Sequence, residues 1–386
     1  MRNRGVSLLI PLLFISGCAP AIHPNYIPRE EPPDLFRIEE NYRVGYIDAH
    51  GRVRIPPQFG AMSGDFSEGL AVVHFYAETI RFGYIDEEGT VVIGSPAQVH
   101  YIDARPFSEG LAAVKVRSDS EAGWGYIDKA GRMVIRPQFE DAGPFSEGLA
   151  RVVIDSSAGL VGFVDRLGAI VITPQFFDAG DFSHGLARVQ LPAEEGQPIS
   201  DGITYSDKSL DPRGGLSGYI DPTGRMAIAA DYKQARDFSE GLAAVRYDDG
   251  GWFYIDRKGK SIIHPFFWPF ATAESFAEGL ARVNLLRWGV GTQFGYINNA
   301  GRIVIDLQFD YGDEGAGRFS AGLAPVSLHG KWGYIDVNGN LAIQPKFDYA
   351  LPYSGGLARV NIGGPGSGDS KWGYIDETGE YVWEPR

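Results

Sequence analysis

Short apolar segments separated by polar turns follow one another through most of the chain. In residues 145–176, two β-branched segments at 149–153 and 161–164 are followed by a polar turn and a third apolar segment, which stops at Thr173-Pro174. Apolar runs of this length, bounded by Gly, Pro and Asp, are typical of β-strands. We therefore predict three strands per unit and an irregular connector over 175–182.

Two motifs show that this unit is repeated. A Gly-Tyr-Ile-Asp motif and its close variants occur nine times, mostly 35 to 42 residues apart with one gap of 56, beginning at Gly45, Gly83, Gly125, Gly162, Gly218, Phe253, Gly295, Gly333 and Gly373. A Phe-Ser-Glu-Gly-Leu-Ala motif lies between the copies, beginning at Phe66, Phe107, Phe145, Phe182, Phe238, Phe276, Phe319 and, degraded, at Tyr353. The first unit lacks this lead-in. A fixed period of this size predicts a repeat array.

An Asp-x-x-Gly turn joins the second and third strands of each unit. Asp caps the backbone of a type I turn, and Gly takes the left-handed conformation that follows. The turn-forming positions are Asp48, Asp86, Asp128, Asp165, Asp221, Asp256, Asn298, Asp336 and Asp376. Asn298 caps a turn as well as Asp does but is a poorer cation ligand, so this repeat keeps the shape without the charge.

The third strand of nearly every unit ends in Ile and has apolar neighbours, as in Met133-Val134-Ile135. A strand that is apolar on both faces is expected to be buried on both, which stacked units can provide. The Gly before Tyr has no side chain, which suits the close approach of a neighbouring backbone.

These features predict an all-β domain over residues 35–386, built from about nine three-stranded repeats in an open, twisted solenoid. A closed β-propeller is the alternative. Residues 191–217 enlarge one hairpin loop of the fifth repeat, and their polar, Gly- and Pro-rich composition is typical of a flexible insertion.

The net charge of −14 makes phosphate-rich partners unfavourable. Residues 1–17 carry two arginines and no acid, so the charge without them is −16. We therefore expect no nucleic-acid partner.

The chain begins with features of a signal peptide over residues 1–17. Arg2 and Arg4 precede an apolar run that is too short to span about 30 Å of hydrocarbon. Ile15-Ser16-Gly17-Cys18 then resembles a bacterial lipobox, and Cys18 is the only cysteine. We expect lipidation of Cys18 and a Pro-rich tether over 18–34. This places the repeats in the bacterial cell envelope, facing the periplasm or the exterior, at the outer membrane if the source is Gram-negative.

The sequence offers little support for catalysis or for a cofactor. Glutamates recur in the Ser-Glu-Gly turns, but His184, Ala321 and Gly355 replace them in other repeats, and no repeat carries a distinct carboxylate pair. The seven histidines are scattered and have no metal-ligand spacing. We expect no catalytic residue, no metal and no cofactor.

Aromatic residues make up 13% of the chain. The regularly spaced ones are expected to fill the interfaces between repeats. Trp268 and Trp288 lie in loops at irregular positions, so these two are the candidate contact aromatics.

Lys331-Trp332-Gly333 and Lys371-Trp372-Gly373, with the Pro-Gln-Phe and Phe-Ser-Glu-Gly-Leu-Ala pieces, resemble the WG-repeat (KWG-repeat) family of bacterial surface and secreted proteins. The resemblance implies a β-rich binding or scaffolding array without catalytic residues. We therefore expect a non-enzymatic, membrane-anchored scaffold for a protein partner. The alternatives are a carbohydrate- or peptidoglycan-binding lipoprotein and, with the least support, a glycoside-cleaving enzyme.

Overall fold

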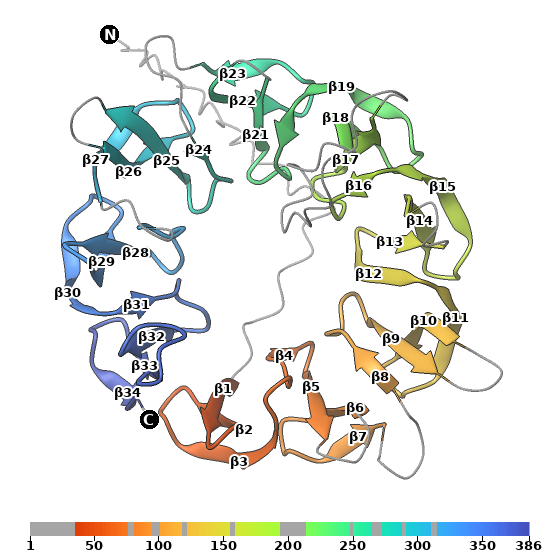
Figure 1. Ribbon diagram of the computed structural model, residues 1–386, viewed down its shortest axis with the longest axis horizontal. Helices are drawn as coiled ribbons and strands as arrows, with labels where there is room; N and C mark the ends of the chain where they lie inside the picture. The colour runs from red at the N-terminus through yellow and green to blue at the C-terminus, as the bar shows by residue number, and fades with distance from the viewer. Residues whose placement is uncertain are drawn as a thin grey trace, which may run out of the picture. The chain divides into compact units, whose positions relative to one another are not determined.

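The computed structural model describes residues 35–75, 81–94, 101–117, 122–154, 159–193, 214–247, 250–264, 272–287, 291–309 and 315–385. The described residues are all-β and contain no helix. They belong to one compact unit, Pro32–Arg386. Figure 1 shows the strands of successive repeats following one another along the chain.

Each repeat contains three antiparallel strands in sequence order. In repeat four, Ala150 of the first strand lies opposite Val164 of the second, and Phe163 lies opposite Ile172 of the third. We number the repeats one to nine by these sets. The first strands are β1 Leu35–Glu40, β5 Leu70–Phe75, β9 Leu111–Arg117, β13 Leu149–Val153, β17 Ala187–Pro192, β21 Leu242–Arg246, β25 Leu280–Arg287, β28 Leu323–Leu328 and β32 Ala358–Ile362. The second strands are β2 Arg43–Asp48, β6 Arg81–Ile85, β10 Ala122–Asp128, β14 Val161–Asp165, β18 Gly214–Ile220, β22 Trp252–Asp256, β26 Gly291–Asn298, β29 Lys331–Asp336 and β33 Lys371–Ile375. The third strands are β3 Val53–Gly60, β7 Val91–Ile93, β11 Met133–Phe139, β15 Ile170–Phe176, β19 Met226–Tyr232, β23 Ser261–Ile263, β27 Ile303–Phe309, β30 Leu341–Phe347 and β34 Tyr381–Trp383.

A short fourth strand lies before the first strand in seven repeats, where the sequence predicts an irregular connector. Its pairing is brief: in repeat five it consists of Asp178 opposite Gln190 and Ala179 opposite Val189. A lead-in strand of two residues, as in repeat five, is too short to produce an alternating pattern, so the sequence carries no strand signal there. These lead-in strands are β4 Phe66–Ser67, β8 Tyr101–Ala104, β12 Asp141–Ser146, β16 Asp178–Ala179, β20 Gln234–Ala235, β24 Thr272–Ala273 and β31 Tyr349–Ala350.

The predicted end of the third strand at Thr173-Pro174 is wrong. Strand β15 continues through both residues to Phe176, with a shift in register between its pairs with Val161 and Phe163. A bulge accommodates proline because the ladder is interrupted at that point. The bulged backbone presses on the glycine opposite, so a Cβ added at Gly162 would lie 2.5 Å from the carbonyl oxygen of Ile172. The predicted close approach of backbone to this glycine is therefore present.

The third strand is buried on one face only, which corrects the prediction of burial on both. In repeat three Ile135 is 2% exposed, whereas Met133 and Val134 are 39% and 42% exposed. In repeat three the third strand is the last strand in the order of its sheet, and no strand or core covers the neighbours of Ile135. The Ile itself is covered by the next repeat, because a Cβ added at Gly168 would lie 2.8 Å from its Cγ2 atom.

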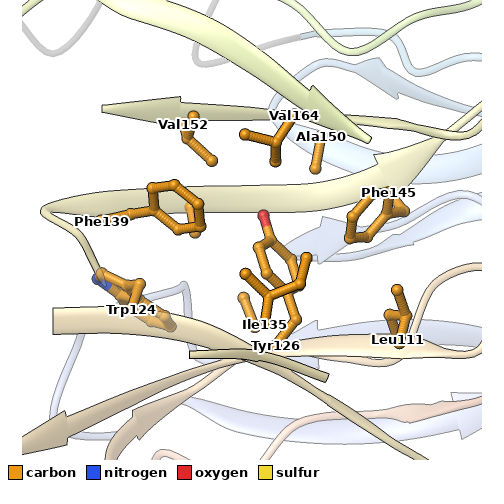
Figure 2. Close-up of a cluster of buried hydrophobic side chains, with 11 residues drawn as sticks. Leu111, Trp124, Tyr126, Ile135, Phe139, Phe145, Ala150, Val152 and Val164 are labelled. Carbon is orange, nitrogen blue, oxygen red and sulfur yellow. The ribbon is translucent and has the colours of Figure 1, made fainter. Parts of the chain in front are cut away.

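The hydrophobic cores lie between consecutive repeats. Figure 2 shows one of them, in which Tyr126, Ile135 and Phe139 of repeat three face Phe145 and Val152 of repeat four. The rings of Tyr126 and Phe145 meet edge to face, with centroids 4.8 Å apart. The same contact joins every later pair of consecutive repeats up to repeats eight and nine. The all-β tandem array is confirmed.

The ninth repeat packs on the first in the same way. Tyr374 donates a hydrogen bond to the carbonyl oxygen of Arg37 at 2.7 Å, and its ring meets Phe36 with centroids 5.6 Å apart. Gly51 faces the backbone of Val382. A separate buried cluster joins the two repeats: Phe36, Ile38, Ile47, Leu357, Tyr374 and Trp383. Among the described strands no sheet closes on itself, which agrees with the predicted open array of separate sheets, and the first and ninth repeats are in contact.

Candidate functional site

Polar side chains gather at the interfaces between repeats, where tyrosine hydroxyls link one repeat to the next. Tyr126 donates to the carbonyl oxygen of Gly143 at 2.8 Å, and Gly143 lies two residues before the lead-in Phe145. The same bond recurs from Tyr46, Tyr84, Tyr219, Tyr254, Tyr296 and Tyr334. Burial raises the pKa of these hydroxyls, and it raises the pKa of Tyr374 to about 12. They are therefore neutral structural donors rather than candidate bases.

The Ser-Glu pair of the lead-in motif is also used between repeats. Ser108 donates to the carbonyl oxygen of Phe145 at 2.7 Å, and the Glu109 carboxylate accepts from the amide of Gly148 at 3.0 Å. Glu109 has a left-handed backbone with φ of 53°, which aims its side chain at the next repeat. Glutamates at this position contact the next repeat in the same way at Glu68, Glu147, Glu240 and Glu278. Carboxylates that accept hydrogen bonds from backbone amides of the next repeat hold the two repeats together. They are poor candidates for acid–base chemistry.

The turn-forming Asp residues lie in the hairpin between the second and third strands. The Asp128 carboxylate accepts hydrogen bonds from the amides of Ala130 and Arg132, each at 3.0 Å, and its side-chain hydrogen bond with Arg132 lowers its pKa. Asn298 accepts the equivalent two bonds at 3.1 and 3.0 Å. The position therefore requires an oxygen acceptor and does not require a charge. The carbonyl of each capping residue accepts the Gly amide in all nine turns, at Asp48, Asp86, Asp128, Asp165, Asp221, Asp256, Asn298, Asp336 and Asp376.

Arginines and carboxylates form a second series between repeats. Arg105 pairs with Asp141 at 2.6 Å, Arg151 with Asp181 at 2.8 Å, and Arg236 with Glu274 at 2.9 Å, in each case across one interface. Arg188 pairs with Asp178 of its own repeat and with Asp237 of the next.

In three repeats of the described structure, an arginine guanidinium lies over the ring of the second-strand tryptophan. Arg105 lies 4.6 Å from the centre of Trp124, Arg236 lies 5.1 Å from Trp252, and Arg359 lies 4.5 Å from Trp372. A guanidinium over an indole face stabilises both groups and closes that face to other ligands.

Two pockets open beside this series. The smaller has a volume of about 290 Å³ and is lined by Arg188, Arg236, Asp237, Trp252 and Ser275, among others. The larger, of about 450 Å³, extends over repeats seven, eight and nine. Sequence reasoning did not identify these pockets, because each combines side chains from three repeats. One signal was available: the residue before the lead-in Phe varies between acid, base and proline, as at Asp237, Arg318 and Pro144.

The regularly spaced aromatics are core residues in the described part of the chain. Trp124 is 3% exposed, and Trp252 and Trp332 are each 6% exposed. The candidate contact aromatics Trp268 and Trp288 lie outside the described residues, as does Cys18.

Neither a metal site nor a membrane-spanning helix is found in the parts of the chain that the structure describes. No three His, Cys, Asp or Glu side chains come close enough there to hold a metal ion. No helix there has the length and apolar character needed to cross a membrane.

The family model for the "WG containing repeat" matches eight segments that together cover more than half of the chain, at residues 45–73, 82–118, 124–156, 162–191, 218–250, 252–285, 294–332 and 332–364. A comparison with curated proteins gives no match.

Several solved structures resemble the fold. The computationally designed Ika8 protein has 10% identity and a TM-score of 0.42, with 82% of this chain and 94% of that chain covered. BamB from Moraxella catarrhalis has 11% identity and a TM-score of 0.40, with 85% and 93% covered. Puromycin hydrolase has 11% identity and a TM-score of 0.42, with 92% and 57% covered. Identities and TM-scores this low carry no functional inference.

Proposed function

The chain belongs to the WG-repeat family, and on this premise we propose that it is a non-enzymatic scaffold in the bacterial cell envelope that binds a protein partner along its third strands. A lipid on Cys18 and the tether over 18–34 hold the repeats at the membrane. The partner is a protein with an apolar surface or an extended segment that can lie against the edge of a sheet.

The observation that carries this proposal is a set of exposed apolar residues at equivalent positions of the third strands. Ile170 and Val171 are 50% and 43% exposed, and Ile303 and Val304 are 47% and 43% exposed. Eight of the nine repeats contribute to this third-strand apolar set: Val53, Val92, Met133, Val134, Ile170, Val171, Met226, Ile262, Ile303, Val304 and Leu341. Single exposed apolar residues are ordinary, but their recurrence at the same two positions of consecutive repeats favours an interaction surface.

The place of these residues in the sheet supports the same proposal. Eight of the nine third strands stand at the end of their sheet, where one side of the backbone has no neighbouring strand in the sheet order, and the ninth, β7, pairs with β6 alone. Natural proteins usually protect such an edge with charge or with a covering element. A partner that adds a strand would gain backbone hydrogen bonds from the edge and apolar contact from its side chains.

The alternatives have less support. The recurring glutamates, which would be the carboxylates of a glycosidase, are bound to backbone amides of the next repeat. A sugar-binding ladder needs exposed aromatic faces, whereas Trp124, Trp252 and Trp332 are buried. The candidate contact aromatics of the carbohydrate alternative, Trp268 and Trp288, lie outside the described residues.

The proposal is tested by site-specific photo-crosslinking in the cells that make the protein. A photoreactive amino acid at Val134 or Val171 is expected to give a discrete product with one envelope protein. The matched position Lys258, which is exposed in a turn, is expected to give none. Once that protein is identified and purified, the double variant Val134→Lys/Val171→Lys is expected to bind it at least tenfold more weakly. Equal crosslinking at Lys258, or unchanged affinity of the double variant, would contradict docking on the third strands.

A second experiment tests lipidation at Cys18. The Cys18→Ser variant is expected to lose incorporation of radiolabelled palmitate and to leave the membrane fraction. Crosslinking at Val134 should then fall because the scaffold no longer stays beside its partner. Palmitate incorporation that persists in this variant would contradict lipidation at Cys18.

A further inference from the structure

The interface between repeats three and four shows how a carboxylate is held between two repeats. The Glu109 carboxylate of repeat three accepts a hydrogen bond from the Gly148 amide of repeat four at 3.0 Å. It also lies 3.5 Å from the guanidinium of Arg166, in the hairpin turn of repeat four. At the preceding interface Lys129 pairs with Glu68 in the same way, at 3.1 Å. An amide and a cation of the later repeat therefore form a site for one carboxylate.

The interface between repeats five and six keeps both donors but lacks the carboxylate. His184 stands at the position of the glutamate, and Arg257 stands at the position of Lys129 and Arg166. Within the described residues the Gly241 amide has no hydrogen-bond partner, and the side chain of Arg257 has neither a hydrogen bond nor an ion pair. Both donors are therefore available to an anion from outside the chain.

The guanidinium of Arg257 is placed as in the filled interfaces. A Cβ added at Gly185 would lie 3.0 Å from its Nη2 atom. A Cβ added at the equivalent Gly110 would lie 3.9 Å from Nη2 of Arg166, the arginine that pairs with Glu109. Arg257 therefore reaches the lead-in turn of repeat five, next to the position where the glutamate is replaced.

The imidazole of His184 does not take the place of the carboxylate. Its Nδ1 atom lies 2.9 Å from the hydroxyl oxygen of Ser183, the residue before it. That hydroxyl donates its own proton to the carbonyl oxygen of Phe238 at 3.1 Å, so Nδ1 donates to the hydroxyl oxygen. The ring is thus held on its own turn and brings no negative charge to Arg257.

The carboxylates of the neighbouring lead-in turns bind other groups. Glu147 accepts a hydrogen bond from the Gly185 amide at 2.8 Å. Glu240 accepts one from the Gly279 amide at 3.0 Å. Neither carboxylate forms an ion pair with Arg257 in the part of the chain that the structure describes. The charge of Arg257 is therefore left for a ligand.

A second interface without the glutamate has the opposite charge. In repeat eight the position is occupied by Ala321, and the hairpin turn of repeat nine has Glu377 where that of repeat six has Arg257. A carboxylate at that position disfavours an anion. Only three of the nine turns carry a cation there, Lys129, Arg166 and Arg257, and only Arg257 faces a repeat without the glutamate.

From these contacts we infer that the interface between repeats five and six binds a small carboxylate anion. Arg257 pairs with it, because the planar fork of arginine matches the two oxygens of a carboxylate. The Gly241 amide donates the hydrogen bond that Gly148 gives to Glu109. Each filled interface holds a single carboxyl group, so an acid as small as acetate has the required chemistry. The inference is independent of the protein-docking proposal, because neither His184 nor Arg257 belongs to the third-strand apolar set.

The test is nuclear magnetic resonance of the purified full-length chain, isotope-labelled at its glycine nitrogens and titrated with sodium acetate. We expect a saturable shift of the Gly241 amide signal. The Gly148 amide is the internal control, because Glu109 already occupies it, and its signal is expected to stay in place. Sodium chloride at the same ionic strength is expected to move neither signal. The absence of a saturable shift at Gly241, or an equal shift with chloride, would overturn the inference.

Three variants localise the binding. Arg257→Gln is expected to raise the acetate concentration at half-saturation about fivefold, through the loss of an exposed charge pair. Lys258→Gln removes a charge from the next exposed position of the same turn and is expected to change it less than twofold. His184→Glu supplies a carboxylate from the chain itself and is expected to make the Gly241 signal unresponsive to acetate. Near-ultraviolet circular dichroism checks that the variants keep the native fold. Unchanged half-saturation in a folded Arg257→Gln variant, or a Gly241 signal that still responds in His184→Glu, would overturn the assignment to this interface.

Discussion

Replacing Gly125 by alanine is expected to lower the free energy of unfolding by about 3 kcal/mol or more. The added Cβ would lie 2.5 Å from the carbonyl oxygen of Ile135 and 2.8 Å from the nitrogen of Pro137. Both atoms belong to the bulged backbone of β11, which cannot move aside as a flexible side chain would. The backbone of Gly125 is not in the left-handed region, so the cost arises from this contact alone.

Gly64→Ala is the matched control for this prediction. No atom lies within 4 Å of a Cβ added at Gly64, and its φ is also outside the left-handed region. Its free energy of unfolding is expected to stay within about 0.5 kcal/mol of the wild type. Urea titration followed by tryptophan fluorescence measures both variants. If Gly125→Ala costs no more than Gly64→Ala, the bulge is not pressed against this glycine in solution.

Replacing Phe36 by alanine is expected to cost about 3–5 kcal/mol, the range for a buried phenylalanine. Phe36 is 8% exposed and packs edge to face on Tyr374 of the ninth repeat. The first repeat has no lead-in phenylalanine, and Phe36 takes over its contact from the first strand. The equivalent first-strand residue is alanine in each of the other repeats: Ala71, Ala112, Ala150, Ala187, Ala243, Ala281, Ala324 and Ala358.

Phe145→Ala provides the comparison, because Phe145 makes the same contact between repeats three and four, inside the array. If the first and ninth repeats pack together in solution, the two variants should lose similar stability. If the ends are apart, Phe36 has no ring to pack against, and its loss should cost much less than that of Phe145. The ratio of the two losses therefore measures the contact between the ends.

The regular parts of each repeat could be predicted from the sequence because local chemistry determines them. Asp128 and Gly131 satisfy a tight turn, and the strands on either side have the expected length and β-branched composition. The lead-in strand could not be predicted in the same way. Asp178 and Ala179 are ordered by pairing with β17 rather than by a pattern of their own.

The errors at the third strand have a physical cause. An apolar run such as Met133-Val134-Ile135 occurs both in strands that are buried on two faces and in strands that expose one apolar face to a partner. The residue types are the same in the two cases, so the sequence does not distinguish them. Proline stops a regular ladder, but at a bulge it does not, so the ends of β11 and β15 lie beyond their prolines.

Contacts between repeats that are far apart in the chain were the hardest features to predict from the sequence. Phe36, where every other repeat has alanine, was a visible exception, but its partner Tyr374 lies more than 300 residues away. The larger pocket likewise combines Arg282, Arg318 and Tyr349 from three repeats. The replacement of an acid by Arg318 can be seen when the lead-in motifs are aligned in the sequence, but the residues that surround it in the pocket cannot.

The most direct test of the account is whether the ninth repeat contacts the first in solution. Glu39 is exposed on β1, and it is among the charged groups that surround Arg359 of the ninth repeat. Cysteines at these two positions, in a Cys18→Ser background, are treated with a short bis-maleimide. The control pair is Arg105→Cys/Asp141→Cys, whose native side chains are 2.6 Å apart across an interface inside the array. We predict an intramolecular crosslink between residues 39 and 359 in a yield similar to that of the control. Efficient crosslinking of the control pair with none between 39 and 359 would contradict the contact between the first and ninth repeats.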